Sequence, residues 1–391
     1  MLRHANAQTI LKLLRQAGSC SRADLVRASG LSAPTVTNVV KDLLAEDLIE
    51  PLGEGESSGG RPPDMIRFKA ERGCILAVEI AADRLSFLLT DLDGKELDSH
   101  DFLLAKQKTT PEAVCGYIGD SVRVLLRQQK KTREQLLMLV VGVPAITNVA
   151  DGIVLSISTL ENWRSVPLRT MLSKVVGCQV IIENDTNLAA QGERYSGAAQ
   201  NERDFIFIRI GTNVGAGIVL GGHIHHGSQW SAGEIAYLRL PSILRRQPTL
   251  HEFGELETVL TTSGILKSWH EAATKSADGS TPRKAITVKE ILDFAQVGDV
   301  CAEKIVQQRA DIVSDVVVNL SLVLNPSLIV LGGEVGSHPT LIASVQKQLE
   351  SSEFAVPRVA ASELGDRAAL WGAIALALEE LSSVLLPLPT A

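Results

Sequence analysis

The chain has 391 residues, more than the roughly 250 to 300 at which one hydrophobic core stops growing, so two or three domains are expected. A composition that is 45% hydrophobic and 21% charged excludes a wholly disordered protein. The net charge of −7 excludes a uniformly basic nucleic-acid-binding protein, so the distribution of charge along the chain matters more than its sum.

The five cysteines are far apart and form no Cys-x-x-Cys pair, which is typical of reduced thiols in a cytosolic protein. Lys12 and Arg15 interrupt the apolar residues near the start, so no signal peptide is predicted. No uninterrupted apolar stretch of about 20 residues is present, so no membrane span is predicted. We therefore expect a cytoplasmic protein without a membrane partner.

Charge divides the chain into a basic head and an acidic body. Residues 1–72 carry 10 Lys and Arg against 9 Asp and Glu, a net charge of +1, whereas the remainder carries 28 against 36, a net charge of −8. Within residues 3–41, six basic residues accompany a single acidic one, Asp24. A basic head of this kind is typical of a domain that contacts DNA phosphates.

The head begins with two predicted helices. Apolar residues from Ile10 to Ala17 recur at three-and-four spacing, and Gly18 ends this first helix. Ser21, with Asp24 three positions later, predicts a capping box at the start of a second helix, which Gly30 ends after two turns.

A third helix follows at once. Ser32 is expected to cap it, Pro34 is tolerated in its first turn, and Val36 to Leu44 supply an apolar stripe. Two short helices joined by a glycine turn predict a helix-turn-helix. On the polar face of the third helix, Asn38 suits a base edge and Lys41 suits a phosphate.

A wing is predicted after these helices. An extended segment from Leu48, a Gly- and Ser-rich tip over 53–60 and an apolar return from Met65 to Phe68 form its two strands. At the tip, Arg61 precedes two prolines and suits a narrow minor groove. The alternative is a helical docking domain with a solvated Arg61. The residues predicted to bind DNA are Arg22, Ser32, Thr35, Thr37, Asn38, Lys41 and Arg61.

From Cys74 onward, apolar strands alternate with helices, which indicates an α/β fold. A strand hairpin is predicted over 75–92, and a second copy of the same plan over 205–220. The repetition indicates a duplicated, two-lobed domain with a cleft between the lobes. The turn of the second hairpin, Gly211 to Gly217, would let backbone amides approach a phosphate closely.

A carboxylate and a carboxamide stand at the end of another predicted strand. Val180 to Ile182 lead into Asn184 and Asp185, and a helix follows from Leu188 to Glu193. Open α/β sheets bind their ligands at such strand ends. The alternative is that Asn184 and Asp185 only cap the helix.

These segments together resemble the repressor branch of the ROK family (repressors, open reading frames and sugar kinases) over essentially the whole chain. The matching stretches are 21–39, 59–63, 142–144, 163–168, 183–187, 211–217, 232–235, 254–257, 325–333 and 364–376. The resemblance implies a winged helix-turn-helix fused to a two-lobed, actin-like (ribonuclease-H-like) domain. It also implies a sugar in the cleft and a homodimer or homotetramer on a double-stranded DNA operator.

The domain organisation expected from this resemblance has two parts. Residues 1–72 form the winged helix-turn-helix, and residues 73–391 form the ROK domain that binds the ligand. Lobe one comprises about 73–187 and the C-terminal helix at about 366–383, and lobe two comprises about 188–365. By motif position, Asp185 resembles the catalytic base of the kinase branch, and Asn184, Glu234 and Glu257 resemble its sugar contacts.

Departures from the kinase pattern argue against catalysis. Where the kinases have an acid, two glycines and a threonine that hold phosphate, this chain has Glu79, Ala81, Ala82 and Asp83. The two Cβ atoms would crowd this turn, and Asp83 is expected to repel a nucleotide by roughly 4 kcal/mol at 4 Å. Because phosphoryl transfer depends on positioning and charge neutralisation, we expect kinase activity to be lost, with Asp185 vestigial and no catalytic residue.

The zinc site of the family is also missing. Tyr237 replaces the expected histidine, and 242–254 contain no cysteine, so neither a metal nor a cofactor is expected. A metal held by His223, His225 and His226 is the alternative to a solvated hairpin turn. Tyr237 also replaces a sugar contact, and Thr159 stands where the family has an asparagine.

The sequence therefore predicts a DNA-binding transcription regulator of sugar metabolism, most simply a repressor, whose effector is a sugar or sugar phosphate bound between the lobes. Two alternatives remain open. The first is a bifunctional sugar kinase, favoured by Asp185 and the intact second glycine-rich turn. The second is a DNA-binding protein controlled by a protein partner, with an inactive cleft.

Overall fold

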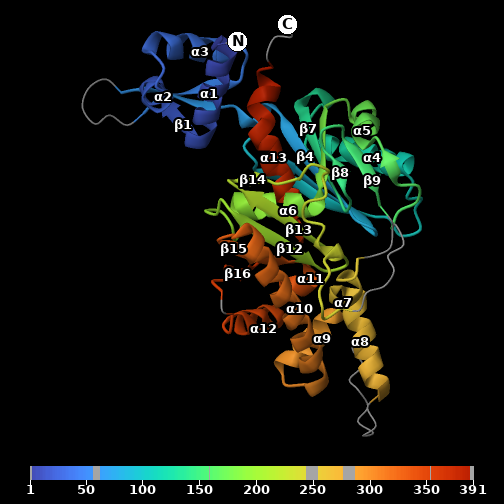
Figure 1. The fold of residues 1–391 in the computed structure, drawn as a ribbon. Helices are drawn as coiled ribbons and strands as arrows, with labels where there is room; N and C mark the ends of the chain where they lie inside the picture. The colour runs from blue at the N-terminus through green and yellow to red at the C-terminus, as the bar shows by residue number, and fades with distance from the viewer. Residues whose placement is uncertain are drawn as a thin grey trace.

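The computed structural model describes residues 2–55, 62–157, 159–243, 254–275, 287–352 and 354–387. A small head, blue in Figure 1, lies at one end of an elongated body. The body contains two five-stranded sheets, with one long helix, α13, running from the head toward the second sheet.

The head is a winged helix-turn-helix. Ser21 and Asp24 form the predicted capping box, Gly30 ends the second helix in the left-handed conformation at φ 68°, and the Ser32 side chain caps the third. The local sequence thus sets each helix end. The elements are α1 (Leu2–Ala17), β1 (Ser19–Ser21), α2 (Arg22–Ser29), α3 (Ala33–Ala45), β2 (Ile49–Glu54) and β3 (Asp64–Phe68), with sheet order β1-β3-β2.

The first sheet of the body belongs to lobe one. Its order is β11-β7-β4-β5-β6, in which β4, β5 and β6 are antiparallel, while β7 and β11 run parallel to β4. The strands are β4 (Cys74–Ile80), β5 (Arg84–Thr90), β6 (Glu96–Leu103), β7 (Leu136–Val143) and β11 (Gln179–Asn184).

The second sheet belongs to lobe two and repeats this plan. Its order is β14-β13-β12-β15-β16, again with an antiparallel meander of three strands followed by two parallel ones. The duplication predicted from the two hairpins is therefore confirmed. The strands are β12 (Phe205–Ile210), β13 (Val214–Leu220), β14 (His223–Ile224), β15 (Leu328–Gly332) and β16 (Arg358–Ala361).

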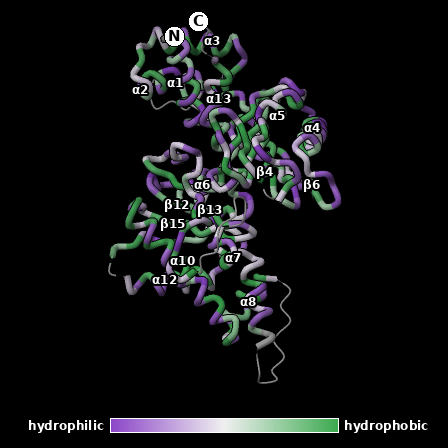
Figure 2. The backbone as a smooth tube through the Cα atoms, turned by 45° about the vertical axis from the view of Figure 1, so that its right-hand side comes forward, coloured by the Kyte–Doolittle hydropathy of each residue, from purple (hydrophilic) through white to green (hydrophobic). Residues whose placement is uncertain are grey.

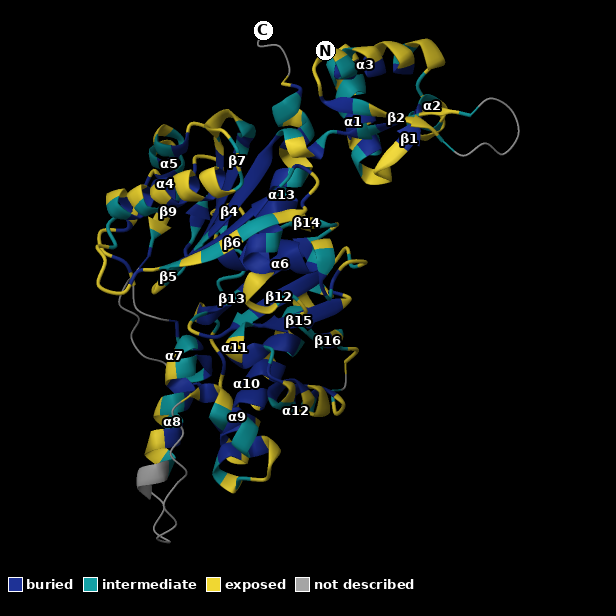
Figure 3. Cartoon of the chain, turned by 180° about the vertical axis from the view of Figure 1, so that it is seen from behind, coloured by how far each residue is buried: buried dark blue, intermediate teal, exposed yellow. Residues whose placement is uncertain are grey.

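Both faces of each sheet are covered, which explains why the central strands are nearly continuous apolar runs. In β4, Leu76 and Val78 pack toward the cluster that contains α4 and α5, whereas Ile75 and Ala77 pack toward α13. Figure 2 shows these strands mainly in the hydrophobic colour, and Figure 3 shows them buried. In lobe one, the helices are α4 (Pro111–Gln128) and α5 (Leu168–Val176), beside a small sheet of β8 (Thr147–Asn148), β9 (Ile153–Ser156) and β10 (Arg164–Val166).

Helices also cover the second sheet, and the buried residues of α10 belong to the same apolar cluster as Ile329 and Leu331 of β15. Within the described ranges, short 3-10 helices connect other elements at 70–72, 133–135, 235–237 and 365–367. The α-helices of lobe two are α7 (Glu257–Leu260), α8 (Thr262–Lys275), α9 (Val288–Gln296), α10 (Val300–Leu324), α11 (Gly333–Gly336) and α12 (Pro339–Leu349).

Two helices cross between the sheets, α6 (Asp185–Ser196) and α13 (Ala368–Leu385). They approach closely because Gly192 and Gly372 meet at the crossing. Among the described residues, only the segment Gly365–Leu385 is long and apolar enough to cross a membrane. Most of α13 is buried against α6 and the first sheet, as in the core helix of a folded domain.

The head contacts the body through α1. Gln8 Nε2 donates to the Leu386 carbonyl at 2.9 Å, and Arg15 donates to the carbonyls of Leu378 at 3.0 Å and Leu92 at 3.2 Å. Arg15 also lies 3.5 Å from Asp93 in the turn between β5 and β6. The orientation of the head is therefore set by contacts with both α13 and lobe one.

Candidate functional site

The first candidate site is the outer face of α3. Thr37, Asn38 and Lys41 are exposed, and within the described part of the chain their side chains have no hydrogen-bond or ion-pair partner. Figure 3 shows this outer face exposed at the end of the molecule. The stripe formed by Val36, Val40 and their neighbours is buried, so the helix presents only its polar face to solvent.

Among the other residues predicted to contact DNA, some side chains already have partners within the protein. The Ser32 hydroxyl accepts from the Thr35 amide and lies 2.8 Å from the Thr35 hydroxyl, so both side chains contribute to the cap of α3. Arg22 lies 3.8 Å from Asp64 of the wing, with both side chains exposed. Arg61 lies outside the described residues.

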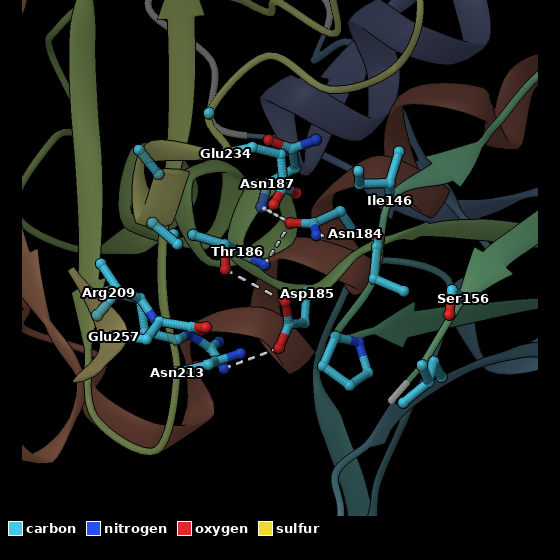
Figure 4. Close-up of a pocket in the computed structure, with 18 of the residues that line it drawn as sticks. Ile146, Ser156, Asn184, Asp185, Thr186, Asn187, Arg209, Asn213, Glu234 and Glu257 are labelled. Carbon is cyan, nitrogen blue, oxygen red and sulfur yellow. Dashed lines mark hydrogen bonds and ion pairs between the residues drawn. The ribbon is translucent and has the colours of Figure 1, made fainter. Parts of the chain in front are cut away.

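The second candidate site is a cavity of about 330 Å³ between the lobes. It brings together Asn184, Asp185, Glu234 and Glu257, the four residues predicted to bind the sugar. Figure 4 shows them converging from the end of β11 and the start of α6, from the loop before the 3-10 helix at 235–237 and from α7. The lining also includes Glu79, Ala81, Ala82, Pro144, Ala145, Thr159, Asn187, Arg209, Asn213, Trp230 and Tyr237.

Asn184 fulfils the capping role that the sequence left open. Its Oδ1 accepts from the amides of Thr186 at 2.9 Å and Asn187 at 3.0 Å, and its Nδ2 donates to the Ala145 carbonyl at 3.2 Å. The residue nevertheless lines the cavity. Because the cap fixes its rotamer, Asn184 is held in one orientation toward any ligand.

Asp185, the first residue of α6, is almost completely buried and is already paired. Its Oδ1 accepts from the Thr186 hydroxyl at 3.2 Å, and its Oδ2 accepts from Arg209 Nη1 at 2.9 Å. Arg209 also contacts Glu79, with Nη1 3.3 Å from Glu79 Oε1. Burial lowers the pKa of Arg209, but Asp185 and Glu79 together raise it above its ordinary value, so the guanidinium stays charged.

Glu234 and Glu257 differ in their surroundings. The Glu257 carboxylate accepts from the amides of Val214 at 3.2 Å and Gly254 at 3.1 Å, which ties α7 to the second glycine-rich turn. No described residue donates a hydrogen bond to the carboxylate of Glu234, which lines the cavity. Burial, together with the charges of Glu257 and Asp185, raises the pKa of Glu234 to about 7.

This shift predicts a pH-dependent stability. The Glu234 carboxyl ionises at about 4.5 when it is unperturbed and at about 7 in the folded protein, so its stabilising effect is complete below pH 4.5 and is lost as the pH rises through 7. Above pH 7 this shift lowers the free energy of unfolding of the wild type by roughly 2 to 3 kcal/mol, and we expect Glu234→Gln to abolish that decrease. Urea unfolding at pH 4.5 and pH 8 measures the difference, with Glu112→Gln at an exposed position of α4 as control. A Glu234→Gln advantage that is equal at both pH values would contradict the assignment.

A second layer of side chains supports the cavity. Glu183 is buried, and its carboxylate accepts from the Asn184 amide and from Asn187 Nδ2, while its other oxygen lies 2.7 Å from His226 Nε2. The hydrogen bond with Glu183 raises the pKa of His226. His226 thus supports the ligand pocket, and the described residues contain no group of three side chains placed to hold a metal with His223 or His225.

The turn between β4 and β5 differs from the expectation in one respect. Glu79, Ala81 and Ala82 line the cavity, but Asp83 does not, because its side chain is 71% exposed and pairs with Arg84 at 3.7 Å. The prediction that Asp83 repels a nucleotide in the cavity is therefore wrong, because the Asp83 carboxylate does not line the cavity. The charged side chains that line the cavity are instead those of Glu79, Asp185, Glu234, Glu257 and Arg209.

Arg209 was not identified from the sequence, and the contact between Glu183 and His226 was not predicted either. Arg209 is the one charged residue in the apolar strand β12, and an isolated charge in a buried strand is a signal that could have identified it. Glu183 precedes Asn184 directly, but only the fold brings it to His226, which is 43 residues away.

Comparisons with known proteins agree with this architecture. Residues 75–380 match the ROK family, and residues 4–50 match a winged helix-turn-helix DNA-binding family. The xylose repressor of Bacillus spizizenii is 26% identical over 355 residues, which cover 90% of this chain and 88% of that repressor. The combination of domains fits a DNA-binding, sugar-responsive repressor.

Two solved structures share the fold. A ROK family transcriptional regulator, a homologue of the Escherichia coli Mlc protein, superposes with a TM-score of 0.80 at 22% identity, covering 98% of both chains. A glucokinase from Streptomyces griseus in complex with glucose and AMPPNP gives a TM-score of 0.63 at 24% identity, covering 78% of this chain and 99% of that one.

Proposed function

Because this chain belongs to the ROK family and carries a winged helix-turn-helix before that domain, we propose that it is a sugar-responsive transcription repressor. In this function, α3 reads a double-stranded DNA operator, and a sugar bound between the lobes changes the affinity for that operator. A homodimer or homotetramer in the cytoplasm fits this role, since symmetric operators are read by symmetric assemblies.

The observation that supports this proposal most directly is the course of α6. The helix begins in the cavity with Asp185 and ends with Tyr195 and Ser196 beside the turn that contains Asp93 and Gly94. Asp93 in turn pairs with Arg15 of the head. A shift of α6 on ligand binding would therefore reach the head through packed contacts, and a ligand acts by binding the two arrangements with different affinity.

The charges in the cavity favour an uncharged sugar over a sugar phosphate. Four carboxylates, those of Glu79, Asp185, Glu234 and Glu257, face one guanidinium, that of Arg209, so a phosphate would meet a net negative charge. Carboxylate oxygens accept hydrogen bonds from sugar hydroxyls, and the Glu234 carboxylate, to which no described residue donates, is best placed to do so.

The proposal is tested by linking sugar binding to DNA binding. An operator is first selected from a random duplex library with the purified full-length protein. Its affinity is then measured by fluorescence anisotropy with D-xylose, D-glucose or glucose 6-phosphate, while calorimetry follows sugar binding. We expect an uncharged sugar to bind and to change operator affinity. A sugar that binds without changing DNA affinity, or tight operator binding with no response to any sugar, would argue for control by a protein partner instead.

A pair of substitutions on α3 tests how the head reads DNA. Lys41→Ala should weaken binding to every duplex and reduce its salt dependence, because a lysine contacts phosphate without regard to sequence. Asn38→Ala should relax preference at one base pair, at a cost of about 1 to 3 kcal/mol. Anisotropy titrations over a salt series compare the operator with a random duplex. Equal losses on both duplexes for Asn38→Ala would exclude its role in base recognition.

The domain limits follow from this assignment. We propose residues 1–72 as the DNA-binding domain and 73–391 as the ROK domain, which agrees with the gap between β3, ending at Phe68, and β4, beginning at Cys74. Lobe one would comprise about 73–187 and the C-terminal helix, and lobe two about 188–365, so that α6 spans the limit between them.

A further inference from the structure

Arg209 lies where both lobes meet at the cavity. It projects from β12 of lobe two, its side chain is 20% exposed, and the remaining residues of that strand are apolar. A cation in such a strand is costly unless carboxylates pair with it. Two do so, Glu79 from lobe one and Asp185 from the start of α6.

The geometry shows that a single guanidinium holds both carboxylates. Arg209 Nη1 lies 2.9 Å from Asp185 Oδ2 and 3.3 Å from Glu79 Oε1, and Nη2 lies 3.4 Å from the same Glu79 oxygen. The carboxylate side chains are only 4% and 12% exposed. Both protons of Nη1 and one of Nη2 are therefore directed at carboxylates rather than at the open cavity.

This arrangement does not fit a magnesium-bound nucleotide. Two converging carboxylates are ligands that Mg²⁺ prefers, and nucleotide-binding proteins use such an ion to carry the phosphates. Here one oxygen of each carboxylate, Asp185 Oδ2 and Glu79 Oε1, already accepts from Arg209. A divalent cation placed between the two carboxylates would also meet the like charge of the guanidinium. A phosphate would find few free guanidinium protons and two negative side chains.

We propose that Arg209 is a specificity-determining residue that takes the place of a divalent cation in the cleft and thereby excludes a Mg²⁺–nucleotide. The uncharged sugar would then bind in the half of the cavity around Asn184 and Glu234. This part of the inference rests on the proposed function. Exclusion of the nucleotide does not depend on DNA binding, so the two ideas can fail separately.

The test measures Mg²⁺ and nucleotide binding without DNA or sugar. Full-length protein is studied at pH 8 by thermal unfolding with MgCl₂ and by calorimetry with Mg²⁺–AMPPNP. The wild type should respond to neither. Arg209→Ala leaves two carboxylates facing a vacated space, so MgCl₂ should raise its unfolding temperature and its affinity for Mg²⁺–AMPPNP should exceed that of the wild type by about tenfold or more.

Two further variants serve as controls. Arg209→Lys keeps a positive charge near both carboxylates and should remain insensitive to MgCl₂. The double variant Arg209→Ala with Glu79→Gln lacks one carboxylate and should lose the gained Mg²⁺ response. Binding of Mg²⁺–AMPPNP to the wild type would overturn the proposal, as would a folded Arg209→Ala that gains no response. If Arg209→Ala does not fold, the wild type and Arg209→Lys provide the test. Binding of Mg²⁺–AMPPNP by either protein would contradict the proposal that the cation at position 209 excludes the nucleotide.

Discussion

Replacing Gly372 with alanine is expected to lower the free energy of unfolding by more than about 3 kcal/mol, because the added methyl group overlaps with backbone that cannot move aside. A Cβ atom at this position would coincide with the Leu188 carbonyl group of α6 and would lie 2.8 Å from the Gly192 amide nitrogen. The two helices would have to separate, and they form the centre of the molecule between the sheets.

Thermal and urea unfolding measure this effect. The expected loss corresponds to a decrease in unfolding temperature of roughly 6 to 12 °C for a domain of this size. Gly116→Ala is the matched control, because Gly116 lies on the exposed face of α4 with nothing within 4 Å of the added Cβ. That change should stabilise the protein by about 0.5 to 1 kcal/mol. Equal stability of Gly372→Ala and wild type would show that the helices do not cross at this glycine.

Replacing Arg15 with methionine is expected to release the head from the body. Arg15 is 12% exposed on the side chain, donates to the carbonyls of Leu378 and Leu92, pairs with Asp93 and stacks over Phe68 at 5.6 Å. Methionine keeps the apolar length but leaves the two carbonyls and the carboxylate without their donor. Loss of these charged hydrogen bonds should weaken docking by about 2 to 4 kcal/mol.

The released head should unfold separately and lose its communication with the cavity. Urea unfolding of Arg15→Met should show two transitions in place of one, and an effector that changes operator affinity in the wild type should change it by less than twofold in the variant. Lys12→Met on the exposed side of α1 is the control and should behave as the wild type does. A single transition with an intact effector response in Arg15→Met would exclude this junction as the connection.

The sequence predicted which residues form the turn between β4 and β5, but not which of their side chains face the cavity. Ala81 and Ala82 line the cavity as expected, but the carboxylate assigned to repel a nucleotide, that of Asp83, points to solvent and pairs with Arg84. Asp83 lies in the turn between β4 and β5, where the regular alternation of a strand does not set the direction of a side chain. The role of a cavity charge belongs instead to Arg209, which the sequence places 130 residues from its partner Glu79.

The sequence by itself determined the local elements, because helix caps, glycine stops and apolar periodicity act over only a few residues. Ser21, Ser32 and Gly30 were enough to define the helices of the head, and the two hairpins were enough to predict a duplicated body. Only the tertiary structure decided which charges meet in the cavity and how the head is held. Arg15 reaches a carbonyl 363 residues away, and such contacts arise only when separate elements pack together.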